Sequence, residues 1–182
     1  MYWKLITYHG IISHQGVEWK VKFKSKNSSM TQEFASNLSQ IIRPGTVVLL
    51  DGPLGSGKTT FTQGFGKALG IKRAIKSPTY TIVKEYAIPN KTSKLVHMDA
   101  YRLEDGGVDS IDLDYYLTED SIILIEWSDF VRDHLPEDFV KITFTPTNDL
   151  NERIIELTLS PKAKDRYGSL LRGLGQSMDK GR

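Results

Sequence analysis

Residues 52–59 carry the strongest chemical signal in the sequence, because glycines, a lysine and a hydroxyl group occur there at a characteristic spacing. The segment Gly52-Pro-Leu-Gly-Ser-Gly-Lys-Thr59 matches the pattern G-x-x-x-x-G-K-[ST] at every fixed position. Glycine lets successive N–H groups curve around a phosphate, and the N-terminus of a following helix adds partial positive charge. We expect Lys58 to reach the β- and γ-phosphates of a nucleotide and Thr59 to bind Mg²⁺. The predicted nucleotide contacts in this loop are Leu54, Gly55, Ser56, Gly57, Lys58, Thr59 and Thr60.

Two carboxylates stand where a metal ion near this loop would need them. Asp99 and Glu126 each follow a short apolar run that is typical of a buried strand. In open α/β sheets, ligands bind outside the carboxyl ends of the strands, so both side chains should face the loop. Mg²⁺ takes few protein ligands and keeps several waters. We therefore predict Thr59, Asp99 and Glu126 as metal residues and Lys58, Asp99 and Glu126 as catalytic residues. An ordinary strand cap is the alternative for either carboxylate alone.

His97 precedes Asp99 by two residues, so in a strand the two side chains point to the same face. Histidine often serves as a general base, because its charge changes near neutral pH. We nevertheless interpret His97 as a packed or hydrogen-bonded histidine and keep the base as the alternative.

The segments around these residues predict an α/β fold. Short apolar runs indicate strands at 46–50, 81–86, 95–98 and 121–125, and helical spacing indicates helices over 29–42 and 59–69. Ser28 or Ser29 should cap the first helix, and Gly70 should end the second. Alternation at 140–144 and 153–159 predicts an antiparallel pair joined by a turn. We expect a P-loop NTPase-like fold, with a mostly parallel central sheet flanked by helices and an antiparallel C-terminal strand pair.

The composition excludes several classes of protein. The chain has 182 residues, of which 25% are charged and 39% hydrophobic, as in an ordinary globular protein of one domain. It has no cysteine, which excludes disulfides, cysteine-ligated zinc, iron–sulfur clusters and a cysteine nucleophile. No apolar run approaches the roughly 20 residues of a membrane helix, and the first residues lack the apolar core of a signal peptide. We expect a cytoplasmic protein without a membrane partner.

Charge is distributed unevenly along the chain. Residues 1–26 contain five lysines and one glutamate, and residues 160–182 contain six basic and two acidic residues. Because the whole chain carries only +2, the part between these ends is acidic. We divide the chain into an N-terminal extension at 1–26 with an edge strand at 18–24, a P-loop ATPase domain at 27–160 and a basic tail at 161–182. A single loose helix is the alternative for the tail. The basic ends could contact RNA or an acidic partner, with simple solvation as the alternative.

Four blocks of the sequence, in order, resemble the TsaE family, also called YjeE, which are small P-loop ATPases of bacterial tRNA threonylcarbamoyladenosine synthesis. The first block is the phosphate-binding loop with residues 61–64 after it. The other three are more specific: Ser77-Pro-Thr-Tyr-Thr-Ile-Val83, His97-Met-Asp-Ala-Tyr-Arg-Leu103 and Ile125-Glu-Trp127. The resemblance runs from about Met30 to Leu159. The chain departs from the family at Pro53, commonly Asp there, at Gly106-Gly107, where acidic residues are usual, and near Asp112, where a family glycine is replaced.

The resemblance implies a role for individual residues. Thr59, Asp99 and Glu126 resemble the Mg²⁺-site residues of the family, and Asp99 is also implied to act on the attacking water. Thr79 lies in a segment that resembles a switch loop near the γ-phosphate. Trp127 matches a tryptophan near the nucleotide and the partner surface, with a core tryptophan as the alternative. Thr31 matches a threonine that approaches the base.

The activity implied by the resemblance is ATP hydrolysis with Mg²⁺, in support of a TsaB–TsaD-type complex that attaches threonylcarbamoyl to adenosine 37 of tRNAs reading ANN codons. Hydrolysis should be slow alone and promoted by partners, and tRNA would be met indirectly or through the basic ends. A P-loop small-molecule kinase is the alternative. It is disfavoured because kinases usually close an arginine-bearing lid over the phosphoryl group, whereas the arginines here are scattered. A GTP switch is disfavoured because Ser93 replaces the aspartate of a guanine-binding NKxD motif.

Overall fold

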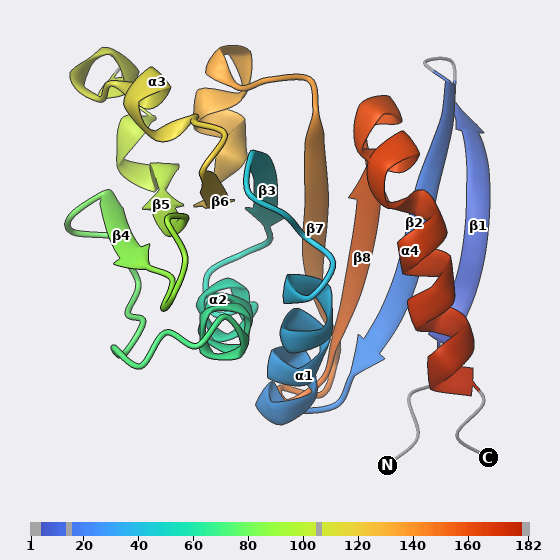
Figure 1. Ribbon diagram of the computed structural model, residues 1–182. Helices are drawn as coiled ribbons and strands as arrows, with labels where there is room; N and C mark the ends of the chain where they lie inside the picture. Colours follow the sequence, from blue (N-terminus) through green and yellow to red (C-terminus); the bar gives the residue numbers. More distant parts are fainter. Residues whose placement is uncertain (1–4, 14–15, 105–106, 180–182) are drawn as a thin grey trace.

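Eight strands form one mixed sheet in the computed structural model, which describes residues 5–13, 16–104 and 107–179 (Figure 1). The order across the sheet is β1-β2-β8-β7-β3-β6-β5-β4. The strands are β1 (Leu5–Ser13), β2 (Gly16–Ser25), β3 (Thr46–Asp51), β4 (Val83–Ala87), β5 (Lys94–Asp99), β6 (Ser121–Glu126), β7 (Phe139–Pro146) and β8 (Arg153–Leu159).

The centre of the sheet is parallel and its margins are antiparallel. β3 pairs in parallel with β6 and β7, and β5 pairs in parallel with β6. On one side β4 runs antiparallel to β5, and on the other side β7, β8, β2 and β1 alternate in direction. This arrangement confirms the predicted fold class, including the antiparallel pair β7–β8 near the C-terminus.

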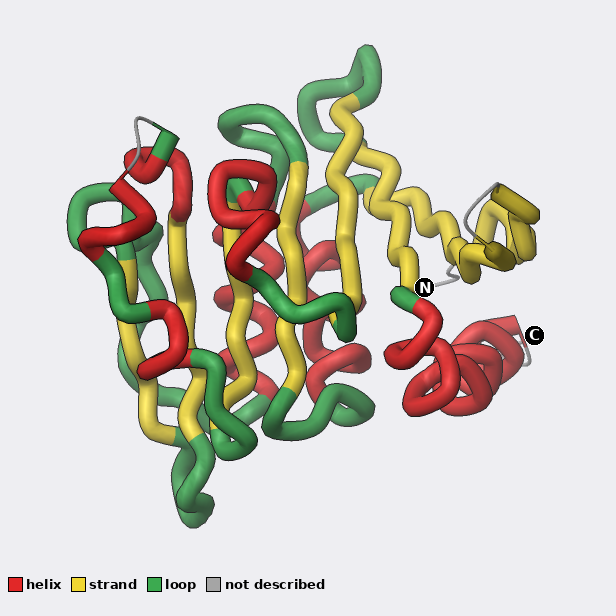
Figure 2. The backbone as a smooth tube through the Cα atoms, turned by 90° about the horizontal axis from the view of Figure 1, so that it is seen from above, coloured by secondary structure: helices red, strands yellow, loops and turns green. Residues whose placement is uncertain are grey.

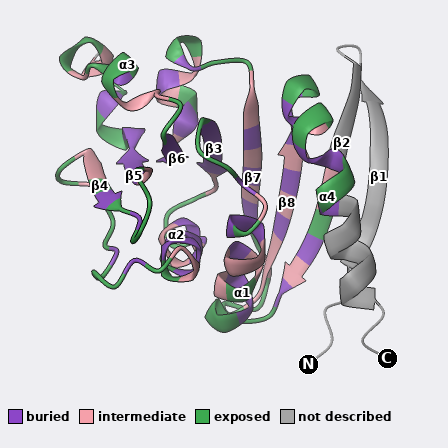
Figure 3. Ribbon diagram, in the orientation of Figure 1, coloured by how far each residue is buried: buried purple, intermediate pink, exposed green. Residues whose placement is uncertain are grey.

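The parallel strands β3 and β6 are buried along almost their whole length (Figure 3). Helical segments cover both faces of the sheet at this point. The side chains on both faces of β3 and β6 are therefore apolar, and apolar and polar residues do not alternate along these strands. Burial on both faces fixes the carboxyl ends of β3, β5 and β6 side by side, and the residues that follow these strands therefore meet at one edge.

Helical segments lie on both faces of the sheet. One core packs α1 (Ser28–Ser39), α2 (Lys58–Ala68) and α4 (Pro161–Asp179) against the strands. A second core covers the other face with short segments only: η1 (Ala100–Leu103), η2 (Gly107–Ser110), α3 (Leu113–Tyr116) and η3 (Ser128–His134). In Figure 2, α4 lies together with β1 at one end of the sheet.

The N-terminal strands correct an expectation. Residues 5–13, which show no periodicity, form strand β1 and pair with β2. The strand predicted at 18–24 therefore lies inside the sheet, because β2 hydrogen-bonds to β1 on one side and β8 on the other. The edge belongs to β1. Residues 1–4 and 14–15 of the predicted extension lie outside the described residues, and the division of the chain at 26/27 and 160/161 stays a prediction.

The ends of two elements also differ from the expectation. Helix α1 is capped by Asn27 rather than by Ser28 or Ser29, because the Asn27 side chain accepts from the backbone N–H of Met30 at 2.9 Å. Strand β4 begins at Val83, two residues later than predicted. The chain turns before it, with the N–H of Ile82 donating to the carbonyl of Pro78 at 2.6 Å. Gly70 follows α2 with φ +85°, as expected for a helix end.

The segment predicted as a basic tail is a packed helix. Ala163, Tyr167 and Leu171 recur every four residues in α4 and are buried in the same core as α1 and α2. The Tyr167 hydroxyl also hydrogen-bonds Thr46 at 2.6 Å. The basic residues between these positions made the apolar face of the helix difficult to recognise in the sequence. Residues 180–182 lie outside the described residues. No helix in the described part of the chain is long and apolar enough to span a membrane.

Candidate functional site

The loop between β3 and α2 is shaped to receive an anion. Gly52 has φ +147°, and a Cβ on it would lie 2.6 Å from the backbone oxygen of Phe144, so no side chain fits there. Gly57 has φ +109° and is the N-cap of α2 without a side-chain capping bond. The first N–H groups of α2 are therefore available to a ligand, and the helix dipole favours one with negative charge.

A cavity of about 610 Å³ opens in front of this loop. Its walls come from the loop and the first turn of α2, from the segment before β4, and from the residues at the carboxyl ends of β5 and β6. The lining residues are Leu54, Gly55, Ser56, Gly57, Lys58, Thr59, Thr60, Ser77, Thr79, Asp99, Tyr101, Glu126 and Trp127. The sheet thus converges on the cavity at the edge where open α/β folds bind their ligands.

Lys58 holds its ammonium group inside the site. The residue is 4% exposed, and its Nζ donates to the carbonyls of Gly52 at 2.7 Å and Pro53 at 3.1 Å. The same ammonium lies 4.5 Å from the centre of the Trp127 ring. Burial lowers the pKa of Lys58 below its ordinary value, and the nearby carboxylates of Glu126, Asp99 and Asp51 oppose that shift. The cation is therefore poorly hydrated and surrounded by negative charge.

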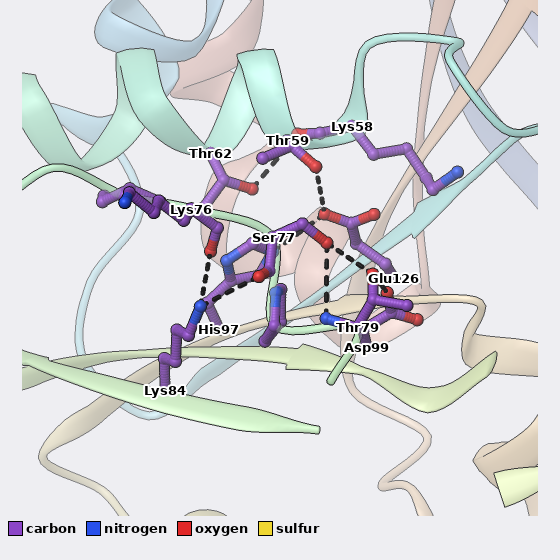
Figure 4. A network of polar contacts seen from close by, with 12 residues as sticks. Lys58, Thr59, Thr62, Lys76, Ser77, Thr79, Lys84, His97, Asp99 and Glu126 are labelled. Atoms are coloured by element: carbon purple, nitrogen blue, oxygen red, sulfur yellow. Dashed lines mark hydrogen bonds and ion pairs between the residues drawn. The ribbon is translucent and has the colours of Figure 1, made fainter. Parts of the chain in front are cut away.

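Glu126 is the centre of a buried hydrogen-bond network (Figure 4). Its Oε1 accepts from the Thr59 hydroxyl at 3.0 Å and from His97 Nε2 at 2.9 Å. Because a carboxylate oxygen only accepts, His97 Nε2 must carry the proton of that bond. His97 is fully buried, which confirms the prediction of a hydrogen-bonded histidine. Two donors on one oxygen fix the orientation of the carboxylate.

Asp99 ties the loop before β4 to the sheet. Its Oδ2 accepts from the Thr79 hydroxyl at 2.6 Å, and its Oδ1 accepts from the backbone N–H of Tyr101 at 3.1 Å. Thr79 is also hydrogen-bonded to the Ser77 hydroxyl at 2.6 Å, and Lys84 Nζ donates to the Ser77 carbonyl at 2.9 Å. The segment that carries Thr79 is thus held beside the cavity by these side-chain bonds and by the backbone N–H of Asp99, which donates to the Ile82 carbonyl at 2.8 Å.

Trp127 lines the cavity and is not a core residue. It is half-buried and adopts φ +59°, a left-handed conformation that turns the chain directly after Glu126. Its ring lies 5.2 Å from the ring of Tyr101 and 6.5 Å from that of Phe130, measured between centroids. Trp127 and Tyr101 both line the cavity, and Phe130 contacts both rings without lining it.

The structure brings together all but one of the predicted site residues. Thr31 lies elsewhere, buried in the first turn of α1, where its hydroxyl is 2.8 Å from Ser25 Oγ and 3.4 Å from the Asn27 carbonyl. The geometry gives no support to a contact between Thr31 and a nucleotide in the cavity. Two lining residues, Ser77 and Tyr101, are not among the predicted ones. Tyr101 follows the predicted site residue Asp99 by two positions, and this closeness in sequence could have indicated that it lines the cavity.

The donor set suits a hard cation that keeps most of its water. The hydroxyl of Thr59 and the carboxylates of Asp99 and Glu126 are the oxygen ligands that Mg²⁺ prefers. The Thr59 proton points to Glu126, so the lone pairs of the hydroxyl remain available. Among the described residues, no group of three or more His, Cys, Asp or Glu side chains could hold a metal by itself. An ion here would therefore need further ligands from water or from bound phosphates.

Comparisons with known proteins agree on one family. Residues 25–155 match the family model described as threonylcarbamoyl adenosine biosynthesis protein TsaE. The protein named tRNA threonylcarbamoyladenosine biosynthesis protein TsaE from Bacillus subtilis is 39% identical over 139 residues, which cover 76% of this chain and 85% of that protein. The protein of the same name from Streptomyces coelicolor is 40% identical over 114 residues, covering 61% and 76%. The crystal structure of Bacillus subtilis YdiB superimposes with a TM-score of 0.74 at 33% identity, covering 91% of this chain and 99% of that one.

Proposed function

This chain belongs to the TsaE family, whose relatives are named as tRNA threonylcarbamoyladenosine biosynthesis proteins, and from that membership we propose that it binds and hydrolyses ATP with Mg²⁺. The observation that carries the proposal is the bond from the Thr59 hydroxyl to Glu126 beside an uncapped helix N-terminus. That arrangement combines an anion cradle with oxygen ligands for a cation.

Nucleotide binding follows from the loop and α2. The N–H groups of residues 55–60 surround the β-phosphate, and the Lys58 ammonium moves from the carbonyls of Gly52 and Pro53 to the β- and γ-phosphate oxygens. Thr59, Asp99 and Glu126 would hold Mg²⁺ through their hydroxyl and carboxylate oxygens. When bound, Mg²⁺ neutralises charge on the phosphate oxygens. Trp127 and Tyr101 pack beside the nucleotide.

Hydrolysis requires a water aligned with the bond to the leaving ADP. We assign the orientation of that water to Asp99, because it lines the cavity and both of its oxygens are held, one by the Thr79 hydroxyl and the other by the Tyr101 N–H. The Lys58 ammonium stabilises the charge that develops on the transferred phosphoryl group. Because the Thr79 hydroxyl donates to Asp99, a change in the order of the segment around Thr79 would change the position of Asp99 and so the rate.

The partner of the reaction is a TsaB–TsaD-type complex, and ATP hydrolysis resets that complex during tRNA modification. Contact with the partner would order the Thr79 segment and so raise a slow basal rate, as partners do for other switch loops. A small-molecule kinase is less well supported, because Lys58 is the only basic side chain among the described residues that line the cavity.

The deciding experiment measures phosphate release from ATP without any acceptor, with and without a purified TsaB–TsaD pair. We expect slow release alone and faster release with the pair. Glu126→Ala should bind ATP but lose this stimulation, and competition with GTP tests the base preference. Phosphate release that depends on an added small-molecule acceptor would support the kinase instead. Normal hydrolysis by both Asp99→Ala and Glu126→Ala would exclude the metal assignment.

A further inference from the structure

A basic surface lies next to the nucleotide cavity, in the part of the chain that is acidic as a whole. Residues 60–103 contain eight basic and only two acidic residues, whereas residues 104–152 contain two basic and fourteen acidic ones. The basic surface runs from the end of α2 along the segment before β4 to η1. Its side chains are Lys67, Lys72, Arg73, Lys76, Lys84 and Arg102.

Contacts of Lys84 and Arg73 bring part of this surface together around β4. Lys84 Nζ donates to the Ser77 carbonyl at 2.9 Å and reaches that of Lys76 at 3.5 Å, which places the lysine of β4 beside the preceding segment (Figure 4). The guanidinium of Arg73 lies 5.9 Å from the ring of Tyr86, also in β4. Arg73, Lys76 and Lys84 therefore lie together at β4, an edge strand of the sheet.

Three lysines of this surface have no carboxylate partner among the described residues, unlike the lysines of β2. Among the described residues, none of Lys67, Lys72 and Lys76 forms an ion pair, and all three are exposed. The lysines of β2 are instead neutralised by β8. Lys22 lies 3.0 Å from Glu156, and Lys24 lies 2.7 Å from Glu152. The surface beside the cavity therefore keeps positive charge without a carboxylate partner in the described part of the chain, whereas Lys22 and Lys24 of β2 are paired.

An exposed aromatic ring accompanies these cations. Tyr80 is 86% exposed, and the Arg102 guanidinium lies 5.0 Å from its ring centre. An aromatic ring that an arginine holds on one face offers the other face to an unpaired base, and basic side chains around it attract the phosphates. An acidic protein would use the cations but would not require the ring.

We propose that the surface formed by Lys67, Lys72, Arg73, Lys76, Lys84 and Arg102, together with Tyr80, binds RNA directly through its phosphates and one stacked base. The RNA source that fits this family is transfer RNA. The proposal goes beyond ATP hydrolysis, because it assigns an RNA contact to this chain itself. RNA bound here would touch the segment whose Ser77 and Thr79 lead to Asp99.

The test measures the affinity of the full chain for a labelled, unmodified tRNA transcript. Fluorescence anisotropy reports the binding, without ATP or partner proteins. The triple variant Lys72→Ala/Arg73→Ala/Lys76→Ala should bind about tenfold more weakly. Its plot of log affinity against log salt should be shallower by about 2, since each lost phosphate contact removes roughly 0.7. The matched control Lys20→Ala/Lys22→Ala/Lys24→Ala removes the same charge from β2 and should change the affinity less than about threefold.

Tyr80→Ala tests the stacked base, with the exposed Tyr115→Ala as its control. We expect about a tenfold loss for Tyr80→Ala and none for Tyr115→Ala. Equal losses for both triple variants, or no binding by the native chain at physiological salt, would overturn the proposal. Equal competition by heparin, with no effect of Tyr80→Ala, would indicate a surface for an acidic protein and overturn it as well. ATP binding is measured on each variant as well. A variant that loses RNA affinity but keeps ATP affinity tests the RNA surface independently of the proposed ATP hydrolysis.

Discussion

Lys58 and Glu126 lie within one cavity but should fail in different ways when replaced. Lys58→Ala removes a buried cation whose charge-assisted hydrogen bonds are worth about 1.5–3 kcal/mol, so we expect ATP affinity to fall roughly 10- to 100-fold. Glu126→Ala removes the shared acceptor of the Thr59 and His97 bonds but leaves the loop and Lys58 in place, so turnover should fall much further than affinity. Calorimetric titration with ATP, alongside steady-state phosphate release, measures both. Equal effects of the two substitutions on affinity would contradict the assigned roles.

His97 is a positioning residue for Glu126, because its Nε2 donates to the carboxylate oxygen that also takes the Thr59 bond. Partners of this kind typically contribute 10- to 100-fold to metal affinity. We expect the ratio of nucleotide affinities with and without Mg²⁺ to be about tenfold smaller in His97→Leu than in the native chain. His97→Gln keeps an N–H donor and should recover much of this ratio. Titration of ADP by calorimetry with and without Mg²⁺ checks this.

The comparison without Mg²⁺ is the control for His97. A substitution that only disturbs packing would lower ADP affinity in both conditions, and the glutamine variant would then be no better than the leucine variant. A role in positioning requires the loss to appear with Mg²⁺ alone.

Among the elements, α1 and α2 depend on one glycine for their close approach. A Cβ at Gly64 would lie 2.5 Å from the backbone of Gln32 in α1. Alanine would favour an isolated helix by about 1 kcal/mol, but overpacking typically costs 1–3 kcal/mol, and here the obstacle is backbone. We expect Gly64→Ala to lower the free energy of unfolding by about 2 kcal/mol in urea denaturation. Lys67→Ala, on the exposed side of α2, should change it by less than about 0.5 kcal/mol.

The elements around the site were predictable because each has a strong and unambiguous pattern in its own sequence. The runs that became β3 and β6 are apolar on both faces, and the glycine-lysine-threonine pattern left one place for the loop. Features whose sequence pattern allows several solutions were predicted wrongly. The cap of α1 went to Asn27 instead of its serine neighbours, which are equally good caps in sequence.

Pairing at a distance explains the other failures. β1 has no alternation of its own and is ordered by its ladder with β2, and α4 shows its apolar face only at every fourth residue among basic ones. The family resemblance implies that Thr31 approaches the base, and only the position of Ser25 shows that its hydroxyl is already engaged. Residues that line the cavity through neighbouring strands, such as Tyr101, need the sheet order before they can be assigned.

The two faces of the whole molecule are built differently, and this has a consequence for amide hydrogen exchange. One face is covered by helices of 11 or more residues, and the other by helical segments of 4 to 7 residues. Short 3₁₀ turns have poorer hydrogen-bond geometry and open locally without global unfolding. Amides in η1 and η3 should therefore exchange at least tenfold faster than those in α1 and α2, as measured by mass spectrometry. Equal protection on both faces would show that the molecule opens only as one cooperative unit. Faster exchange in η1 would make the wall that carries Tyr101 the first part of the cavity to open.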